Sequence, residues 1–170
     1  MAGETILIID DNVDVCSLLA ERVLPSYGYR TLTAADGREG LWQIRTQKPD
    51  LVLLDLRLPD MTGLELLHLL SSEGHDTPVI LITAYGSELI AAQALRMGVR
   101  DYIIKPFTLD EIVESVERAL TEQRLRHERN VLTDDLQDCI GALRMLADAG
   151  ARPGPEDPNL RLCHLLDVAV

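Results

Sequence analysis

One stretch, residues 51–63 (LVLLDLRLPDMTG), constrains the fold of this chain more than any other. Four apolar residues run up to the carboxylate of Asp55, and Pro59 and Gly63 follow soon after it. A short apolar run bounded by such breakers is typical of a strand buried on both faces, as in a parallel sheet. Asp55 would then lie at the carboxyl end of its strand, where open α/β sheets bind their ligands. The alternative is an aspartate that only ends the strand and caps the next helix.

Apolar runs of the same kind recur along the chain and predict a five-stranded sheet. The other four runs cover residues 5–9, 29–34, 79–82 and 101–104. Apolar residues between the runs recur at helical spacing, which predicts five helices, and three of these are expected to be capped by Asn12, Ser87 and Asp110. Strands that alternate with helices imply right-handed βαβ crossovers and a doubly wound parallel α/β sheet. Periodicity does not give the order of the strands.

Composition and charge bound the class of protein. The chain has 170 residues, of which 46% are hydrophobic, and a formal net charge of −12. That charge opposes direct binding to nucleic acid or to an anionic membrane, and no apolar run approaches the length of a membrane span. Three widely spaced cysteines without a CxxC motif, Cys16, Cys139 and Cys163, favour reduced thiols over metal ligation. We therefore expect a soluble, cytoplasmic protein.

Four of the predicted strands end on polar residues, namely Asp10-Asp11, Asp55, Thr83 and Lys105. In a parallel sheet these ends lie along one edge, so the side chains are expected to meet there. Carboxylates gathered at one edge repel each other and need a cation, and oxygen ligands with open positions for water favour Mg²⁺ over Ca²⁺. A lysine and a hydroxyl at the same edge would neutralise and orient an incoming charged group. Together these groups fit phosphoryl transfer to a carboxylate nucleophile, which is ionised at neutral pH without a general base.

The combination of these motifs resembles the signature of the response-regulator receiver domain. The matching residues fall in the family's order and spacing over residues 4–122: Asp10-Asp11, Asp55 with the following Leu-Pro-Asp-Met-Thr-Gly, Thr83-Ala84 and Lys105-Pro106-Phe107. The resemblance implies the strand order 2-1-3-4-5 and a cis Lys105–Pro106 peptide. It also implies that Asp55 is phosphorylated by a phosphohistidine of a sensor histidine kinase or phosphotransfer protein. Such a domain is a signalling phosphoacceptor and not an enzyme with substrates of its own.

The resemblance assigns a role to each residue of the predicted site. Mg²⁺ would be held by Asp11, Asp55 and the backbone carbonyl of Arg57, with Asp10 assisting through water. Thr83 and Lys105 would contact the phosphoryl oxygens.

A switch is implied as well. Phosphorylation adds about −1.5 to −2 charges, which would draw Thr83 toward the phosphoryl group and let Tyr102, at the family's aromatic switch position, fill the vacated space. The responding surface would comprise the helix near residues 87–98, the strand at 101–104 and the helix capped by Asp110. In this family that surface commonly forms a homodimer.

Three alternatives remain. A pseudo-receiver would act as a constitutive interaction module without phosphorylation. A haloacid-dehalogenase-like phosphatase also uses a strand-end aspartate and Mg²⁺, but it needs a second aspartate two positions later, where this chain has Arg57 or Asn12. A flavodoxin-like mononucleotide binder is disfavoured because no glycine- or hydroxyl-rich phosphate loop follows the first strand.

Residues 123–149 are expected to form a helical connector with coiled-coil character. Apolar residues there follow steps of seven, four, three, four and three: Leu125, Leu132, Leu136, Cys139, Leu143 and Leu146. The apolar stripe of the preceding helix does not continue into this seam in register, so a separate helix is expected to begin near Leu125. It would form a dimeric coiled coil or fold back on its own domain. Residues 150–159 (GARPGPEDPN) predict a linker, and residues 160–170 the start of a further helix or output domain.

Overall fold

The computed structural model describes residues 3–84 and 88–148, and a five-stranded parallel sheet lies at its centre. The strands are β1 (Thr5–Ile9), β2 (Arg30–Ala34), β3 (Leu51–Asp55), β4 (Val79–Thr83) and β5 (Asp101–Ile104). Their order in the sheet is β2-β1-β3-β4-β5, and each neighbouring pair is parallel. The doubly wound α/β fold and the order 2-1-3-4-5 are therefore confirmed.

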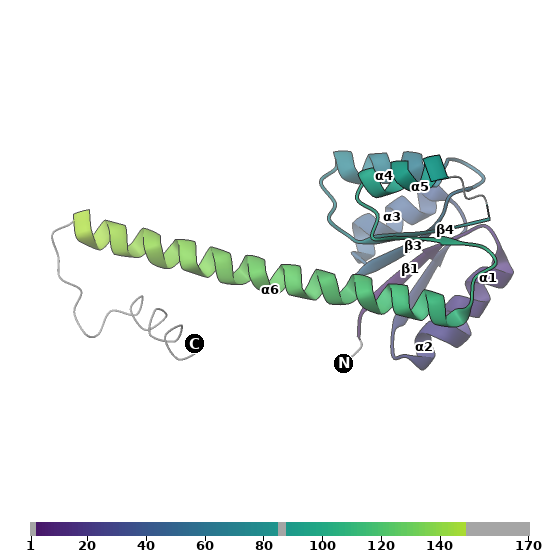
Figure 1. Cartoon of the computed structure of the whole chain (residues 1–170), viewed down its shortest axis with the longest axis horizontal. Helices are drawn as coiled ribbons and strands as arrows, with labels where there is room; N and C mark the ends of the chain where they lie inside the picture. Colours follow the sequence, from purple (N-terminus) through teal and green to yellow (C-terminus); the bar gives the residue numbers. More distant parts are fainter. Residues whose placement is uncertain (1–2, 85–87, 149–170) are drawn as a thin grey trace. The chain divides into compact units, whose positions relative to one another are not determined.

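Helices cover both faces of this sheet (Figure 1). The described helices are α1 (Val13–Ser17), the π-helix η1 (Leu18–Val23), α2 (Leu24–Ser26), α3 (Gly37–Gln47), α4 (Gly63–Ser72), α5 (Glu88–Arg96) and α6 (Leu109–Asp148). The segments α1, η1 and α2 follow one another directly where the sequence predicts a single helix. In Figure 1, α3, α4 and α5 lie on one side of the sheet, and α1, α2 and the beginning of α6 lie on the other.

The core consists of two aliphatic clusters, one on each face of the sheet. Ile6 and Ile8 of β1 point into the cluster with η1 and α6, whereas Leu7 and Ile9 point into the cluster with α3, α4 and α5. All residues of β3 and β4 are buried, as the continuous apolar runs predict. Each fully buried Leu or Ile contributes about 1.5–3 kcal/mol relative to exposure. These clusters fix the positions of the strand ends, and hence of the polar residues that follow them.

Two of the predicted helix caps can be compared with the structure, and one of them is wrong. The side chain of Asn12 accepts hydrogen bonds from the backbone N–H groups of Asp14 and Val15, so it caps α1 as expected. At the start of α6, Thr108 and Glu111 form a reciprocal capping box instead of a cap by Asp110. Asp110 lies one residue inside the helix, where its charge favours the positive end of the helix dipole. The predicted cap Ser87 lies outside the described residues.

Helix α6 runs without a break from Leu109 to Asp148. The expectation of a separate helix beginning near Leu125 is therefore wrong, although the chain divides by its contacts into two units, residues 1–123 and 124–170. In the second unit, the seam residues Leu125, Leu132 and Leu136 are 60%, 53% and 49% exposed. The predicted linker at 150–159 and the segment 160–170 lie outside the described residues.

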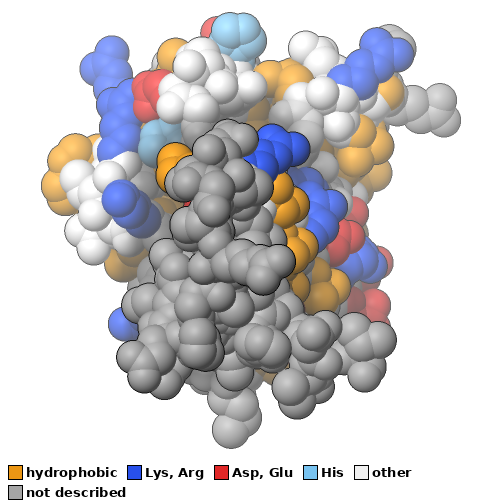
Figure 2. Space-filling view, turned by 90° about the vertical axis from the view of Figure 1, so that its left-hand side faces the viewer, with side chains coloured by type: hydrophobic (Ala, Val, Ile, Leu, Met, Phe, Trp, Pro, Cys, Tyr) orange, Lys and Arg blue, Asp and Glu red, His pale blue; other side chains and the backbone are white. Residues whose placement is uncertain are grey.

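Cysteine state, hydropathy and surface charge can also be compared with the sequence. Cys16 is a free thiol, but Cys139 is disulfide-bonded, so the expectation of reduced thiols is wrong for Cys139. Within residues 3–84 and 88–148, no helix combines the length and the apolar character needed to cross a bilayer. On the face shown in Figure 2, Lys and Arg side chains lie among acidic, hydrophobic and uncharged ones.

Candidate functional site

The carboxyl ends of β1, β3 and β5 bring two carboxylates and one ammonium group together. Asp10 directly follows β1, Asp55 is the last residue of β3, and Lys105 directly follows β5. The Nζ atom of Lys105 lies 2.6 Å from Oδ2 of Asp10 and 2.6 Å from Oδ2 of Asp55. Because β1 and β3 are neighbours in the sheet, their two carboxylates end side by side and share this one cation.

Burial acts against the charged forms of the groups in this cluster. Asp10 is 4% exposed, and its burial raises its pKa, although hydrogen bonds from Lys105 and from the backbone N–H of Asn12 act in the opposite direction. Burial acts to lower the pKa of Lys105, but its hydrogen bonds to the two carboxylates outweigh burial and raise it. Lys105 is thus held as a cation at neutral pH, and it neutralises part of the charge on Asp10 and Asp55.

The loop that follows β3 contacts the second carboxylate oxygen of Asp55. Its Oδ1 atom accepts a hydrogen bond of 3.0 Å from the backbone N–H of Arg57. The N–H of Gly63 donates to the carbonyl of Leu56 at 2.8 Å, and Arg57 pairs with Thr62 in an antiparallel bridge. A Cβ atom on Gly63 would lie 2.7 Å from the carbonyl oxygen of Asp55, closer than real contacts allow. The glycine of the LPDMTG motif is therefore needed for the loop to pack against its own strand end.

The two predicted switch residues lie on neighbouring strands and face the same side of the sheet. Thr83 is fully buried at the end of β4, and its carbonyl accepts the backbone N–H of Lys105 at 2.7 Å. Tyr102 pairs with Leu81, two residues before Thr83, and packs half-buried against the cluster with α3, α4 and α5. Alternate residues of a strand share a face, so Thr83 and Tyr102 both face these helices. The Lys105–Pro106 peptide is cis, as the resemblance implies.

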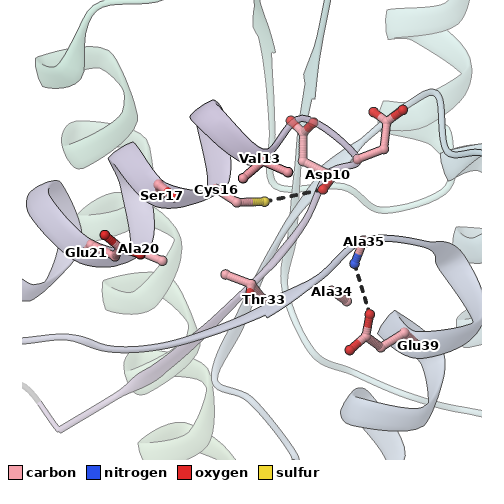
Figure 3. A pocket seen from close by; sticks show the side chains of 11 residues that line it. Asp10, Val13, Cys16, Ser17, Ala20, Glu21, Thr33, Ala34, Ala35 and Glu39 are labelled. Atoms are coloured by element: carbon pink, nitrogen blue, oxygen red, sulfur yellow. Dashed lines mark hydrogen bonds between the residues drawn. The ribbon is translucent and has the colours of Figure 1, made fainter.

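Asp10 and Asp11 line a surface pocket between the start of α1 and the ends of β1 and β2. Figure 3 shows Cys16 in this pocket, where its thiol donates to the carbonyl of Asp10 at 3.3 Å. Burial raises the pKa of Cys16 to about 11, so its thiol stays protonated at neutral pH. The pocket therefore meets the end of β1 through the backbone of Asp10 as well as through the thiol of Cys16.

The donor set at this edge suits a hard cation. Within residues 3–84 and 88–148, no three His, Cys, Asp or Glu side chains lie close enough together to hold a metal ion. Instead, Lys105 bridges Asp10 and Asp55, and Asp11 is exposed. The available donors are nevertheless all oxygens, and their negative charge is only partly balanced by one ammonium group. By this chemistry the residues fit Mg²⁺.

One polar residue of the loop after β3 received no role from the sequence. The two carboxylate oxygens of Asp60 accept the backbone N–H groups of Gly37 and Arg38, at 2.8 and 3.0 Å. These are N–H groups of the first turn of α3, more than 20 residues earlier in the chain. The sequence places Asp60 in a proline-containing loop directly after a buried strand, but it does not show which helix supplies the N–H donors.

A doubly wound sheet with two acidic strand ends, a lysine strand end and a hydroxyl strand end defines a class of signalling domains, and comparison with known proteins places the chain in it. The family model of the response regulator receiver domain matches residues 6–117. The chain belongs to this family.

Relatives and solved structures agree with this assignment. The chain is 42% identical over 123 residues to the regulatory protein AtoC of Escherichia coli, and the matched region covers 72% of this chain and 26% of AtoC. It is 39% identical over 125 residues to the nitrogen assimilation regulatory protein NtrX of Azorhizobium caulinodans, covering 72% of this chain and 27% of NtrX. The signal receiver domain of a Luxo repressor protein from Vibrio parahaemolyticus superposes with a TM-score of 0.70 at 29% identity, over 73% of this chain and 95% of that one. The chain thus spans about a quarter of the length of the curated relatives it matches.

Proposed function

We propose that this chain is a phosphorylation switch in which Asp55 accepts a phosphoryl group from a phosphohistidine of a sensor kinase or phosphotransfer protein. The contact of Lys105 with both Asp55 and Asp10 at 2.6 Å is the observation that carries the proposal. An oxygen of Asp55 attacks phosphorus, and the phosphorus–nitrogen bond to the histidine breaks with its electron pair going to the nitrogen. The imidazole keeps the proton on its other ring nitrogen and leaves as a neutral group. The ammonium group of Lys105 then balances charge on the phosphoryl oxygens. The chain acts only on its own phosphorylation and dephosphorylation, in the cytoplasm.

Asp11, Asp55 and the backbone carbonyl of Arg57 would hold Mg²⁺, and Asp10 would assist through water. When bound, the ion supplies positive charge that stabilises the oxygens of the transferring phosphoryl group. The hydrogen bond from Arg57 N–H to Asp55 supports this role, because it keeps residue 57 beside the carboxylate. Lys105 contacts Asp10 as well as Asp55, so it can remain with one carboxylate when the other takes up a new ligand.

The response to phosphorylation would pass through Thr83 and Tyr102. The hydroxyl of Thr83 would donate to a phosphoryl oxygen. Tyr102, which lies on the same face of the sheet, would then fill the space that Thr83 vacates. The surface formed by α5, β5 and the start of α6 would then form a homodimer, or the exposed seam of α6 would pair with a second copy. The partner within the whole protein would be an output domain.

Mass spectrometry with a small phosphodonor tests the proposal. The purified chain is incubated with acetyl phosphate in the presence of Mg²⁺ or of EDTA, and its intact mass is measured. We expect one added phosphoryl group with Mg²⁺ and none with EDTA. If a folded chain gains no phosphoryl group from acetyl phosphate or other donors, the chain is a constitutive interaction module instead.

A further inference from the structure

The loop that follows the phosphoacceptor is tied to the N-terminus of α3 by two adjacent residues. The carboxylate of Asp60 accepts the N–H groups of Gly37 and Arg38 at 2.8 and 3.0 Å. The side chain of Met61 lies over Gly37, where an added Cβ would meet the Met61 Cγ at 2.5 Å. One contact is polar and the other apolar, and together they fix the tip of the loop against the helix.

The contacts of Asp60 lie beside a cap that α3 supplies for itself. Helix α3 already has its own cap, because Asp36 accepts the N–H of Glu39 at 2.8 Å. Asp60 accepts the N–H groups of Gly37 and Arg38, the two residues before Glu39, and the N–H groups of a first helical turn have no acceptor within their own helix. Burial acts to raise the pKa of Asp60, but these two N–H donors lower it, so Asp60 is an ionised acceptor at neutral pH. The interaction thus joins a charged group of one element to the dipole of another.

The same loop carries the groups that surround Asp55. Within it, the N–H of Leu58 donates to the carbonyl of Met61 at 3.2 Å, and Arg57 pairs with Thr62. Arg57 in turn donates its N–H to Asp55. A short hydrogen-bonded path therefore connects the loop tip to residue 57, whose carbonyl is the proposed magnesium ligand.

We propose that Asp60 is a positioning residue, which anchors the β3–α4 loop on α3 and thereby holds Arg57 in place for Mg²⁺ and for the phosphoryl group. This inference rests on the proposed phosphorylation of Asp55 and adds a residue to it. Asp60 touches neither the reacting atoms nor the metal, so its loss weakens magnesium binding without removing a ligand. The expected loss is several-fold, smaller than the roughly 10- to 100-fold loss typical when a group bonded directly to a metal ligand is removed.

A matched pair of variants, Asp60→Ala and Asp36→Ala, tests this role. Both remove one carboxylate from the N-terminus of α3, but only Asp60 belongs to the loop after the phosphoacceptor. The rate of phosphorylation by acetyl phosphate is measured as a function of Mg²⁺ concentration, and thermal unfolding reports the loss of stability in each variant. We expect Asp60→Ala to raise the Mg²⁺ concentration for half-maximal rate several-fold, Asp36→Ala to leave it unchanged, and Asp60→Asn to fall between wild type and Asp60→Ala.

Hydrogen exchange gives a second readout that does not depend on phosphorylation. The amides of Arg57 and Leu58, which are bonded within the loop, should exchange faster in Asp60→Ala and not in Asp36→Ala. If wild type takes up no phosphoryl group, the proposed function fails and this exchange experiment alone decides whether Asp60 anchors the loop. Equal effects of the two variants, or no effect of Asp60→Ala on either readout, would overturn the inference, because Asp60 would then only cap a helix.

Discussion

The ammonium group of Lys105 lies 2.6 Å from a carboxylate oxygen of Asp55, and the same atom lies 2.6 Å from Asp10. One cation thus serves two buried acids that come from neighbouring strands. The arrangement neutralises only part of the negative charge at the site. The remaining charge makes the site receptive to a divalent cation.

Replacement of Lys105 should reveal this shared role. In Lys105→Met, Asp10 and Asp55 lose their common donor, and we expect a loss of about 1–3 kcal/mol in the free energy of unfolding, the range for a buried polar group left without its partner. Urea unfolding in EDTA measures the loss. Added Mg²⁺ should stabilise the variant more than wild type, because the metal replaces the missing positive charge. Arg22→Met, which removes a charge from an exposed residue of η1, is the control; equal losses in both variants would contradict the account.

The ionised form of Asp10 should destabilise the metal-free protein at neutral pH. Burial raises the pKa of Asp10 above its ordinary value of 3.8, so the folded state binds a proton more tightly than the unfolded state does. The resulting stability is fully present below pH 3.8 and is lost as the pH rises through the raised pKa. We therefore expect Asp10→Asn to have a higher Tm than wild type at pH 7 in EDTA, with the difference disappearing near pH 3.8. A lower Tm for Asp10→Asn at pH 7 would contradict this.

Gly63 should tolerate no side chain. A Cβ atom there would lie 2.7 Å from the carbonyl oxygen of Asp55, which is backbone and cannot move away cheaply. We expect Gly63→Ala to lower the free energy of unfolding by about 1–3 kcal/mol, as overpacking does, and to slow phosphorylation. Gly141→Ala is the matched control, because Gly141 lies in α6 with nothing within 4 Å of an added Cβ. That substitution should leave stability equal or higher, since alanine favours the helix. Chemical denaturation distinguishes the two.

The seam of α6 should determine the oligomeric state if it pairs with a second copy. Leu132 lies on the seam and is 53% exposed, whereas its neighbour Val131 is 45% exposed and lies off the seam. A charge at Leu132 would have to be buried between two helices, so Leu132→Glu should abolish a dimer that Val131→Glu leaves intact. Sedimentation of both variants with and without acetyl phosphate measures this. A wild type that remains monomeric under both conditions would contradict pairing through the seam.

Much of the fold could be predicted from local patterns in the sequence. The apolar runs of β3 and β4 are buried on both faces, and only central strands of a parallel sheet require this. Because all strands run in one direction, the polar residues at the carboxyl ends of β1, β3 and β5 had to lie on one edge. The structure adds the contact itself, in which Lys105 binds two carboxylates at once.

What local patterns missed depends on contacts between distant residues. Thr108 and Asp110 are both residues of cap type, and only the backbone geometry shows that the capping box with Glu111 forms at Thr108. The apolar stripe of α6 changes register near Leu125, but a helix continues wherever no residue breaks it, so one helix results where two were expected. The carboxylate of Asp60 accepts from Gly37 and Arg38 of α3, which lie more than 20 residues away in the chain, so a local pattern could not reveal this contact.

Intact-mass spectrometry on wild type and Asp55→Asn, after incubation with acetyl phosphate and Mg²⁺, tests the central claim most directly. Asp110→Asn, an exposed aspartate in the first turn of α6, makes the same chemical change away from the site. The account predicts one phosphoryl group on wild type and on Asp110→Asn, and none on Asp55→Asn. An adduct that persists in Asp55→Asn, or its absence from a folded wild-type chain, would contradict the assignment of Asp55 as the phosphoacceptor.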